Sequence, residues 1–323
     1  MKKLFFFAAL MTAAVMSAKD VVVFENTFTT SSEKTINNKE LGTPAVLWTN
    51  TQNVIAGTAP AASKTTTNYL SIAARKETGA NGQNIVTAPI ANFNEPFTSE
   101  LSEIEADSVV WTFNMRYNYD YCSGFDTAQS AQRGIATVLV SDNEDLNLGN
   151  GYAVVINTTS YFKLVRFTDG LDANENINEL LSSEKMTKLE SPALKANCRY
   201  VALKVISVPA SNAWRFFYSV NPSNSFVDPA EVEWTEAAGG PVTDATHTSK
   251  DMSHFGFLNK YAGNVDATMF IKNFKIIAYG VPETPTGIDE LNTRTQSRKV
   301  LRDGQLIILR DGMEYNVLGQ FIH

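Results

Sequence analysis

The stretch Val109-Val-Trp-Thr-Phe-Asn-Met-Arg-Tyr-Asn-Tyr-Asp-Tyr121 decides the fold, because large apolar side chains occupy every second position and polar ones fill most positions between them. Successive side chains of a β-strand point to opposite faces, so this pattern predicts a strand with one buried face. A strand of this length spans about 40 Å at about 3.3 Å per residue. Such a length favours the large sheets of a jelly roll over an immunoglobulin-like domain.

Period-two patterns also dominate the rest of the chain from Asp20 to Gly280. Further strands are predicted at Val21–Phe28, Tyr69–Ala74, near Val86, and at Gly134–Ser141, Tyr152–Asn157, Tyr161–Phe167, Tyr200–Val208, Trp214–Val220 and Met269–Tyr279. Only Asn176–Lys188 is a passable helix, and it is short. Many strands with little helix predict an all-β fold, in which two long antiparallel sheets pack face to face as a jelly-roll sandwich.

Composition narrows the class of protein further. Hydrophobic residues make up 44% of the chain and charged residues 19%, which is typical of a globular core and argues against disorder. The net charge is −7 and the basic residues are scattered, so nothing favours a nucleic-acid partner. In an exported chain, Cys122 and Cys198 would form either a disulfide or two separate buried thiols, and both alternatives stay open.

The first eighteen residues have the three parts of a secretory signal. Lys2 and Lys3 provide the positive charge, Leu4–Met16 is apolar, and Ser17-Ala18 precede the charged Lys19-Asp20. The apolar run is shorter than the roughly 20 residues of a membrane-spanning helix. The sequence therefore predicts a signal peptide over 1–18, a sandwich over 19–280, a linker over 281–298 and a C-terminal segment over 299–323. We expect the mature protein to be secreted or surface-exposed and not membrane-spanning.

Two pairs of segments resemble concanavalin A-like, or laminin-G-like, domains. Gly149–Ile156 followed by Phe162–Gly170 is similar to paired strands of that family, and His254–Phe257 with Ala267–Ile276 is similar to its closing strands. The resemblance covers most of Asp20–Gly280 and implies a jelly-roll sandwich. It is a pattern of strands and carries no functional signature.

The C-terminal segment has its own turns and short strands. Val281–Gly287 is a proline-containing linker, and Asp303-Gly304 and Asp311-Gly312 are hairpin turn signals between three short strands. With its Leu318-Gly-Gln320 ending, the segment resembles the C-terminal sorting domains of Bacteroidetes proteins, which the type IX secretion machinery recognises. It lacks the upstream Tyr-Pro-Asn-Pro motif of the longer version. The alternative is an ordinary terminal hairpin packed on the sandwich.

Candidate catalytic residues are few. Glycan hydrolases need two carboxylates at a short separation, and alternate positions of one strand supply it. Glu103 and Glu105 are the nearest pair, and Glu231 and Glu233 come second. A solvated loop edge is the plainer explanation of the first pair, and an exposed strand that of the second. The chain has no Gly-x-Ser-x-Gly elbow and no His-x-x-x-His pair. We expect its three histidines to lie on the surface or in loops.

Two other groups of side chains could bind ligands. Tyr117, Tyr119 and Tyr121 could stack on sugars near the end of the long strand, although alternating aromatics usually fill a core. Two turns concentrate oxygen donors of the kind that calcium binds, at Asp142, Asp145, Asp169 and Asp172. Such turns are also common without metal, because their side chains cap their own backbone.

The interpretation favoured by the sequence is a non-catalytic, exported recognition protein that binds a glycan or a protein partner. It needs no cofactor, with calcium as a possible addition. The main alternative is a glycan-active hydrolase with an acid pair on one sheet. A structural surface component without a small ligand is the third.

Overall fold

The computed structural model of the protein describes residues 18–56, 63–72, 81–118, 134–156, 161–171, 176–185, 198–221, 225–261, 268–283, 298–302, 305–310, 313–316 and 320–322. The chain divides into a larger unit, Lys19–Val281, and a smaller one whose described strands lie in Pro282–His323. Residues 1–17 of the expected signal peptide lie outside the described part, so that assignment stays a prediction. No helix among the described residues has the length and apolar character needed to cross a membrane.

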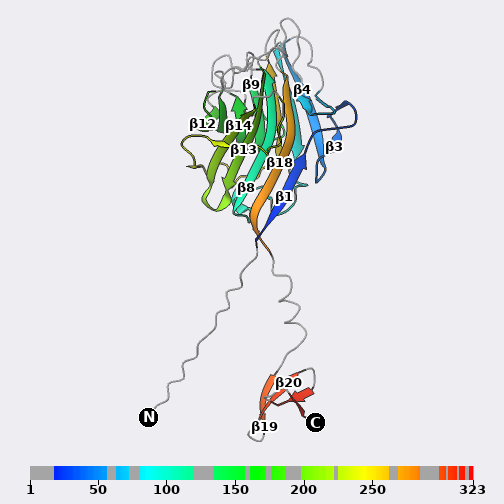
Figure 1. Ribbon diagram of the computed structural model, residues 1–323, viewed down its shortest axis with the longest axis vertical. Helices are drawn as coiled ribbons and strands as arrows, with labels where there is room; N and C mark the ends of the chain where they lie inside the picture. Colours follow the sequence, from blue (N-terminus) through cyan, green and yellow to red (C-terminus); the bar gives the residue numbers. More distant parts are fainter. Residues whose placement is uncertain are drawn as a thin grey trace. The chain divides into compact units, whose positions relative to one another are not determined.

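The first sheet of the larger unit has ten strands (Figure 1). Their order is β15-β14-β13-β8-β18-β6-β5-β2, with β1 beside β18 and β16 beside β14. The strands are β1 (Ala18–Asn26), β2 (Lys34–Thr35), β5 (Lys64–Thr65), β6 (Leu70–Ile72), β8 (Ser108–Asn118), β13 (Cys198–Val208), β14 (Ala213–Asn221), β15 (Thr235–Glu236), β16 (Val242–Thr243) and β18 (Met269–Pro282).

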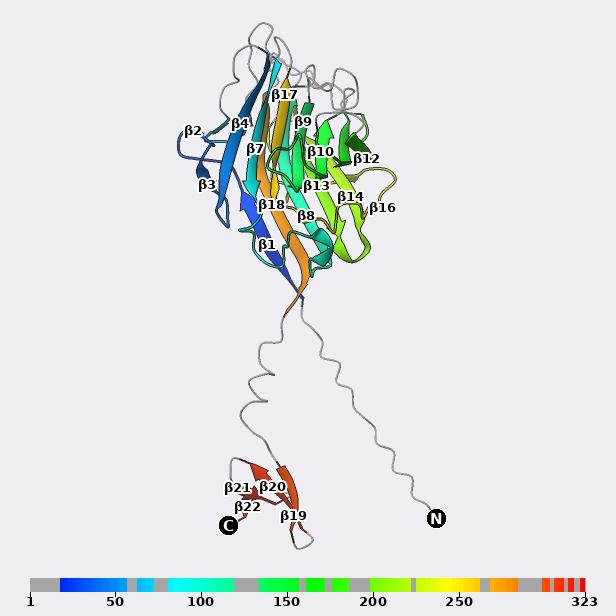
Figure 2. The ribbon, with the colours of Figure 1, turned by 180° about the vertical axis from the view of Figure 1, so that it is seen from behind.

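The second sheet of this unit has eight strands, and Figure 2 shows β7, β17 and β9 side by side within it. Its order is β12-β11-β10-β9-β17-β7-β4-β3. The strands are β3 (Lys39–Leu41), β4 (Val46–Ala56), β7 (Asn81–Pro89), β9 (Gly134–Ser141), β10 (Gly151–Ile156), β11 (Phe162–Phe167), β12 (Ile177–Ser182) and β17 (His254–Tyr261). Two short 3-10 helices, η1 (Leu101–Glu103) and η5 (Pro209–Ser211), lie in connections.

The main core lies between the two sheets and is built from the inward-facing residues of the long strands. On β8, Trp111, Phe113 and Met115 are fully buried, as the alternation predicted. Trp111 stacks on Trp214 of β14 with ring centroids 6.2 Å apart, which continues the aromatic packing across the first sheet. The paired strands are antiparallel and the two large sheets are packed around one core, so the predicted all-β, two-sheet sandwich is confirmed.

The helix predicted over Asn176–Lys188 is wrong where the structure describes it. Residues Ile177–Ser182 form β12, the edge strand that pairs with β11. Leu181 is only 4% exposed and packs into the main core, so burial and pairing outweigh the helix preference of its Glu and Leu residues. The eleven-residue strand β4 was not predicted from the sequence, because its polar run Thr49–Asn53 lacks the alternation of apolar and polar residues.

The smaller unit contains a separate four-stranded sheet. Its strands are β19 (Arg298–Arg302), β20 (Gln305–Arg310), β21 (Met313–Tyr315) and β22 (Phe321–Ile322), one more than the sequence predicted. Ile307 of β20 is 7% exposed, whereas Leu301, at 72%, and Phe321, at 49%, remain open. The small sheet therefore buries little apolar surface by itself.

Candidate binding groove

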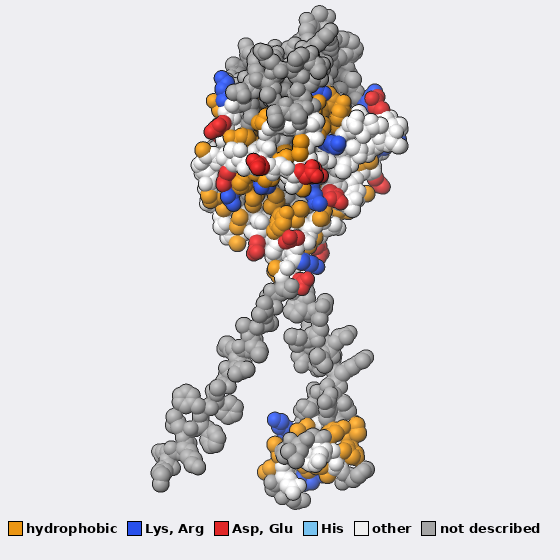
Figure 3. Space-filling view, in the orientation of Figure 1, with side chains coloured by type: hydrophobic (Ala, Val, Ile, Leu, Met, Phe, Trp, Pro, Cys, Tyr) orange, Lys and Arg blue, Asp and Glu red, His pale blue; other side chains and the backbone are white. Residues whose placement is uncertain are grey.

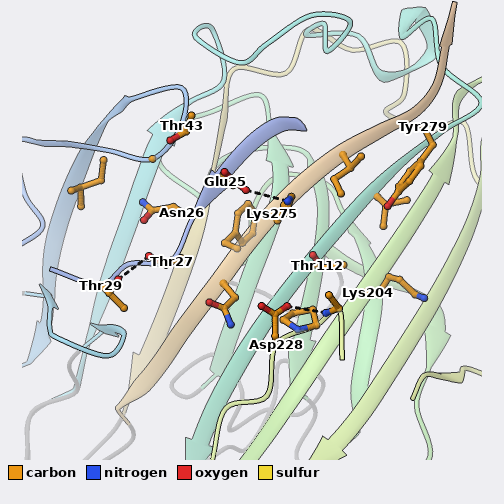
Figure 4. A pocket seen from close by; sticks show the side chains of 18 of the residues that line it. Glu25, Asn26, Thr27, Thr29, Thr43, Thr112, Lys204, Asp228, Lys275 and Tyr279 are labelled. Carbon is orange, nitrogen blue, oxygen red and sulfur yellow. Dashed lines mark hydrogen bonds and ion pairs between the residues drawn. The ribbon is translucent and has the colours of Figure 1, made fainter. Parts of the chain in front are cut away.

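A groove of about 750 Å³ lies against the outer face of the ten-stranded sheet (Figure 4). Strands β8, β13 and β18 contribute its floor, while β1, the turn after β3, Asp228–Ala230 and Trp234 contribute its sides. The lining mixes charged groups, hydroxyls and amides with apolar side chains, including Glu25, Asn26, Thr27, Thr43, Thr112, Lys204, Asp228, Trp234, Asn273, Lys275, Ile277 and Tyr279. Over the larger unit, Figure 3 shows acidic, basic and hydrophobic side chains intermingled in the same way.

A β-bulge in β18 turns one run of side chains toward the groove. Ile271 faces the core before the bulge and Phe274 faces it afterwards, so the inward-facing parity changes between them. Asn273 sits at the change with φ of 52°, and the pairing with β8 shifts register there. An extra residue in one strand produces this kink and reverses which face its successors occupy. Lys275 therefore points outward into the groove.

Asn114 of β8 ties the floor of the groove to the side that carries Asp228. Its side chain is 2% exposed although it lies on the outer face of the sheet. Its Nδ2 donates to the carbonyl oxygen of Val227 at 2.8 Å, and its Oδ1 accepts from Nδ2 of Asn273 at 2.9 Å. One amide thus holds both the segment that precedes Asp228 and the bulge of β18.

Lys204 of β13 lies between two aromatic rings. Its Nζ is 4.4 Å from the ring centroid of Phe217 and 4.5 Å from that of Trp234. Burial lowers the pKa of Lys204, the charge of Arg215 lowers it further, and Glu236 opposes the change. Arg215 itself holds Glu236 through two hydrogen bonds of 2.7 Å, from Nε and Nη2. Lys204 therefore makes cation–π contacts with two rings, and the nearby carboxylate of Glu236 is bound by Arg215.

Both carboxylates of the groove have partners in the protein. Glu25 of β1 forms an ion pair with Lys275, Oε2 to Nζ, at 3.1 Å, as Figure 4 shows. Asp228 Oδ1 accepts from the backbone N–H of Ala230 at 2.9 Å and so caps its own turn. This arrangement suits reversible binding of a polar ligand better than proton transfer, because the acids are engaged in structural contacts.

The structure places the predicted catalytic pairs outside the groove. Glu103 ends η1 and Glu105 follows in the loop before β8, and both are exposed on either side of buried Ile104. Glu231 and Glu233 are also exposed and precede β15 instead of lying within a strand. The spacing of alternate strand positions therefore does not apply to either pair.

The predicted sugar-stacking tyrosines and the cysteine pair are only partly placed. Tyr117 belongs to β8, but its side chain lies outside the described residues, as do Tyr119 and Tyr121 entirely. Cys198 begins β13 with its side chain outside the description, and Cys122 lies outside it altogether. Both assignments stay predictions.

The candidate calcium ligands act as turn caps. Asp142 accepts from the backbone N–H and the side-chain amide of Asn150 at 2.6 and 2.7 Å. Asp145 Oδ1 accepts from the backbone and side-chain nitrogens of Asn147 at 3.0 and 2.9 Å. Asp169 adopts a left-handed φ of 58°, and Asp172 lies outside the described residues.

No group of three acidic, histidine or cysteine side chains that could hold a metal occurs in the described ranges. The residues present are nonetheless oxygen donors of the right kind. Calcium binding by these turns stays a prediction.

A second cluster of ionisable groups is buried at the edge of the main core. The Tyr152 hydroxyl donates to Asp244 Oδ1 at 2.8 Å, and Arg166 Nη1 donates to Asp244 Oδ2 at 2.6 Å. Trp214 stacks on the Tyr152 ring at 4.3 Å and donates from Nε1 to the Asp244 carbonyl oxygen at 3.1 Å. Asp244 is 8% exposed, so these contacts brace the segment after β16 against β10 and β11 and offer no access to a ligand.

One histidine of this cluster lies in a loop, as expected, but is buried. His247 is 2% exposed, and its Nε2 lies 2.9 Å from the Thr168 hydroxyl. Burial lowers the pKa of His247, assisted by the charges of Lys250 and Arg166. His254 begins β17, is partly buried, and its pKa is also lowered by burial. Neither is a surface histidine, because tertiary packing covers the loop that carries His247 and the end of the strand that carries His254.

The groove itself was not found from the sequence. In the sequence, Trp234 is an isolated aromatic residue and Lys204 is one polar position in an alternating strand, so nothing indicates that they lie together. Their contact joins β13 to a segment thirty residues later. A faint signal existed, since a lysine at an outward position among Val, Leu and Ile marks the solvent face of a strand.

No protein-family model matches the chain, and no curated protein matches it. Among solved structures, the VIP36 exoplasmic/lumenal domain bound to Ca²⁺ and Man3GlcNAc is similar with 13% identity and a TM-score of 0.43, over 76% of this chain and 87% of that one. Winged bean acidic lectin complexed with methyl-α-D-galactose has 10% identity and a TM-score of 0.43, over 83% and 100%. Peanut lectin with a 9mer peptide has 11% identity and a TM-score of 0.41, over the same shares. Similarities this distant carry no inference about what the chain binds.

Proposed function

We propose that the protein is an exported, non-catalytic recognition protein that binds a glycan in the groove on its ten-stranded sheet. The observation that carries the proposal is the lining of this groove, in which an indole and aliphatic side chains lie among hydroxyls, amides and charges. Sugars present apolar ring faces and many hydroxyl groups, so they match such a mixture. Most small-molecule sites likewise combine an apolar lining with a few placed polar groups.

Trp234 is the residue that tests this function. We expect the chain from Lys19 to His323 to bind members of a glycan array, and Trp234→Ala to weaken that binding about tenfold, since one stacked aromatic ring contributes about 1–2 kcal/mol. Phe321→Ala is the matched control, because Phe321 is 49% exposed but belongs to the small sheet. Glycan affinity unchanged by Trp234→Ala would remove the groove as the binding site. If the chain captures a protein and binds no glycan, its ligand is a protein and not a glycan.

Hydrolysis of the glycan is the second candidate, because Glu25 and Asp228 both face the groove. Each is engaged with a protein partner, so we expect no release of reducing ends from any bound glycan. Turnover that disappears in both Glu25→Gln and Asp228→Asn would establish a hydrolase instead. Turnover that survives both changes would point to a contaminant.

For the smaller unit we propose a role in sorting or anchoring at the cell exterior. Its separate sheet and the open side chains of Leu301, Met313 and Phe321 support a surface made for a protein receptor. We expect deletion of residues 299–323 to leave glycan binding unchanged and to retain the protein inside the cell. Normal export of the deleted chain would end this part of the proposal.

A further inference from the structure

We propose that the groove selects anionic saccharides and that Lys204 receives their negatively charged group. The inference rests on the proposed glycan-binding function and adds the class of ligand. It comes from the cations around the groove, among which Lys204 is the one without an ion-pair partner in the described part of the chain.

Three cations lie in or beside the groove. Lys275 is neutralised by Glu25 at 3.1 Å, and Arg215 is held by Glu236 through two hydrogen bonds of 2.7 Å. Within the described part of the chain, Lys204 makes no such ion pair and instead faces the two rings at 4.4 and 4.5 Å. Its ammonium is thus the positive charge that a ligand can still neutralise.

The surroundings of Lys204 make an anion favourable there. The ammonium has lost part of its hydration to Phe217 and Trp234, and the neighbouring Arg215 repels it. A carboxylate or sulfate would restore both the lost hydrogen bonds and the charge balance, and hydrogen bonds between opposite charges are the stronger kind. The competing acid in the groove, Asp228, is occupied by the turn N–H of Ala230 at 2.9 Å.

The position of Lys204 also fits a sugar. Trp234 lies beside it, so a pyranose stacked near the indole would bring a ring substituent toward the ammonium. Thr112 and Asn273 line the same groove and supply hydroxyl and amide groups for the uncharged substituents. A uronic acid, with one carboxylate on a ring of hydroxyls, has the required chemistry.

The test compares each acidic saccharide with its own neutral form. Oligogalacturonides and hyaluronan octasaccharides are titrated calorimetrically into the full mature chain, alongside the same oligosaccharides after carboxyl reduction. We expect the acidic forms to bind about tenfold more tightly, as one charge-assisted hydrogen bond provides. The difference should shrink as salt is raised.

The variants separate recognition from structural support. Lys204→Gln should abolish the preference for the acidic form while keeping the affinity for the reduced form, and Lys204→Arg should retain the preference. Lys272→Gln is the matched control, because Lys272 lies outward on β18 outside the groove lining. If Lys204→Gln does not fold, the salt dependence of the unmodified protein still decides.

The possible failures are distinct. Equal binding of acidic and reduced saccharides, still weakened by Trp234→Ala, would overturn the anionic preference and leave the glycan-binding function standing. A preference that survives Lys204→Gln would overturn the role of Lys204. Absence of binding to any saccharide, acidic or neutral, would overturn both proposals.

Discussion

Replacing Asp244 with asparagine tests whether the buried cluster at the edge of the core depends on charge. In the native chain, one carboxylate oxygen accepts from the Tyr152 hydroxyl and from the backbone N–H of Thr246, while the other accepts from Arg166 at 2.6 Å. Asparagine has one acceptor oxygen and one donor nitrogen. If the oxygen serves Tyr152, the amide nitrogen is left facing the donor Nη1 of Arg166, which loses its counter-charge.

The expected loss follows from burial. The side chains of the ion pair are 23% exposed for Arg166 and 8% for Asp244, so water replaces little of the lost interaction. Breaking a buried pair by removing one partner typically costs about 3–5 kcal/mol. Because the Arg166 side chain retains some contact with solvent, we expect Asp244→Asn to lower the free energy of unfolding by about 3 kcal/mol.

Equilibrium unfolding in urea, followed by tryptophan fluorescence, measures this loss. Asp251→Asn is the matched control, because Asp251 is exposed and should change stability by less than about 0.5 kcal/mol. Tyr152→Phe should give an intermediate loss of about 2 kcal/mol, since it removes the hydrogen bond donated to Asp244 and the one accepted from the His247 N–H but keeps the ion pair. A loss below about 1 kcal/mol for Asp244→Asn would show that the cluster is held by shape alone.

Three further predictions concern His247, Asn114 and Gly170. The free energy of unfolding should fall as pH drops below about 6.5, because the pKa of His247 is lowered in the folded state and the unfolded chain therefore binds more protons. Urea midpoints measured between about pH 8 and 5 follow this fall, and His247→Gln should reduce it. Asn114→Ala should cost about 2–3 kcal/mol and weaken glycan binding, because it releases Val227 and Asn273 together; calorimetric melting and glycan titration check both effects. Gly170→Ala should cost more than about 3 kcal/mol in a urea titration, because its φ is 99° and a Cβ would lie 1.7 Å from a backbone carbonyl oxygen of the neighbouring loop.

The sandwich could be predicted because its evidence is local. A strand buried on one face must alternate, and β8 does so from Val109 to Met115, so this strand and the all-β class followed from the sequence alone. The bulge of β18 could not be predicted in the same way. Apolar residues occupy both faces of Met269–Tyr279, and the change of parity at Asn273 depends on its left-handed backbone and on Asn114 of another strand.

The groove was beyond prediction for a topological reason. Only the pairing of β1, β18, β8 and β13 brings its lining together. The lining consists of Glu25–Thr27, Thr29, Leu41–Thr43, Val110, Thr112, Lys204, Asp228–Ala230, Trp234, Asn273–Lys275, Ile277 and Tyr279. Each contributes one or two ordinary polar residues to an ordinary strand. The sequence drew attention to Tyr117 and to acid pairs such as Glu103 and Glu105, because those residues are neighbours along the chain. The residues that are neighbours in the folded groove come from different strands and are far apart in the sequence.

The way the groove is held bears on how it would bind. The buried amide of Asn114 joins β18 to the segment that precedes Asp228, and the two acids of the groove already have partners in Lys275 and the Ala230 N–H. A ligand would therefore meet side chains whose positions are fixed before binding, which reduces the entropy lost on association. Lys204 is the exception, because its charge is held in place by aromatic rings and is not neutralised by an acid. A preformed site with one cation that no acid neutralises gains selectivity at that cation, since ligands that lack the complementary group leave the partly buried ammonium without its best partner.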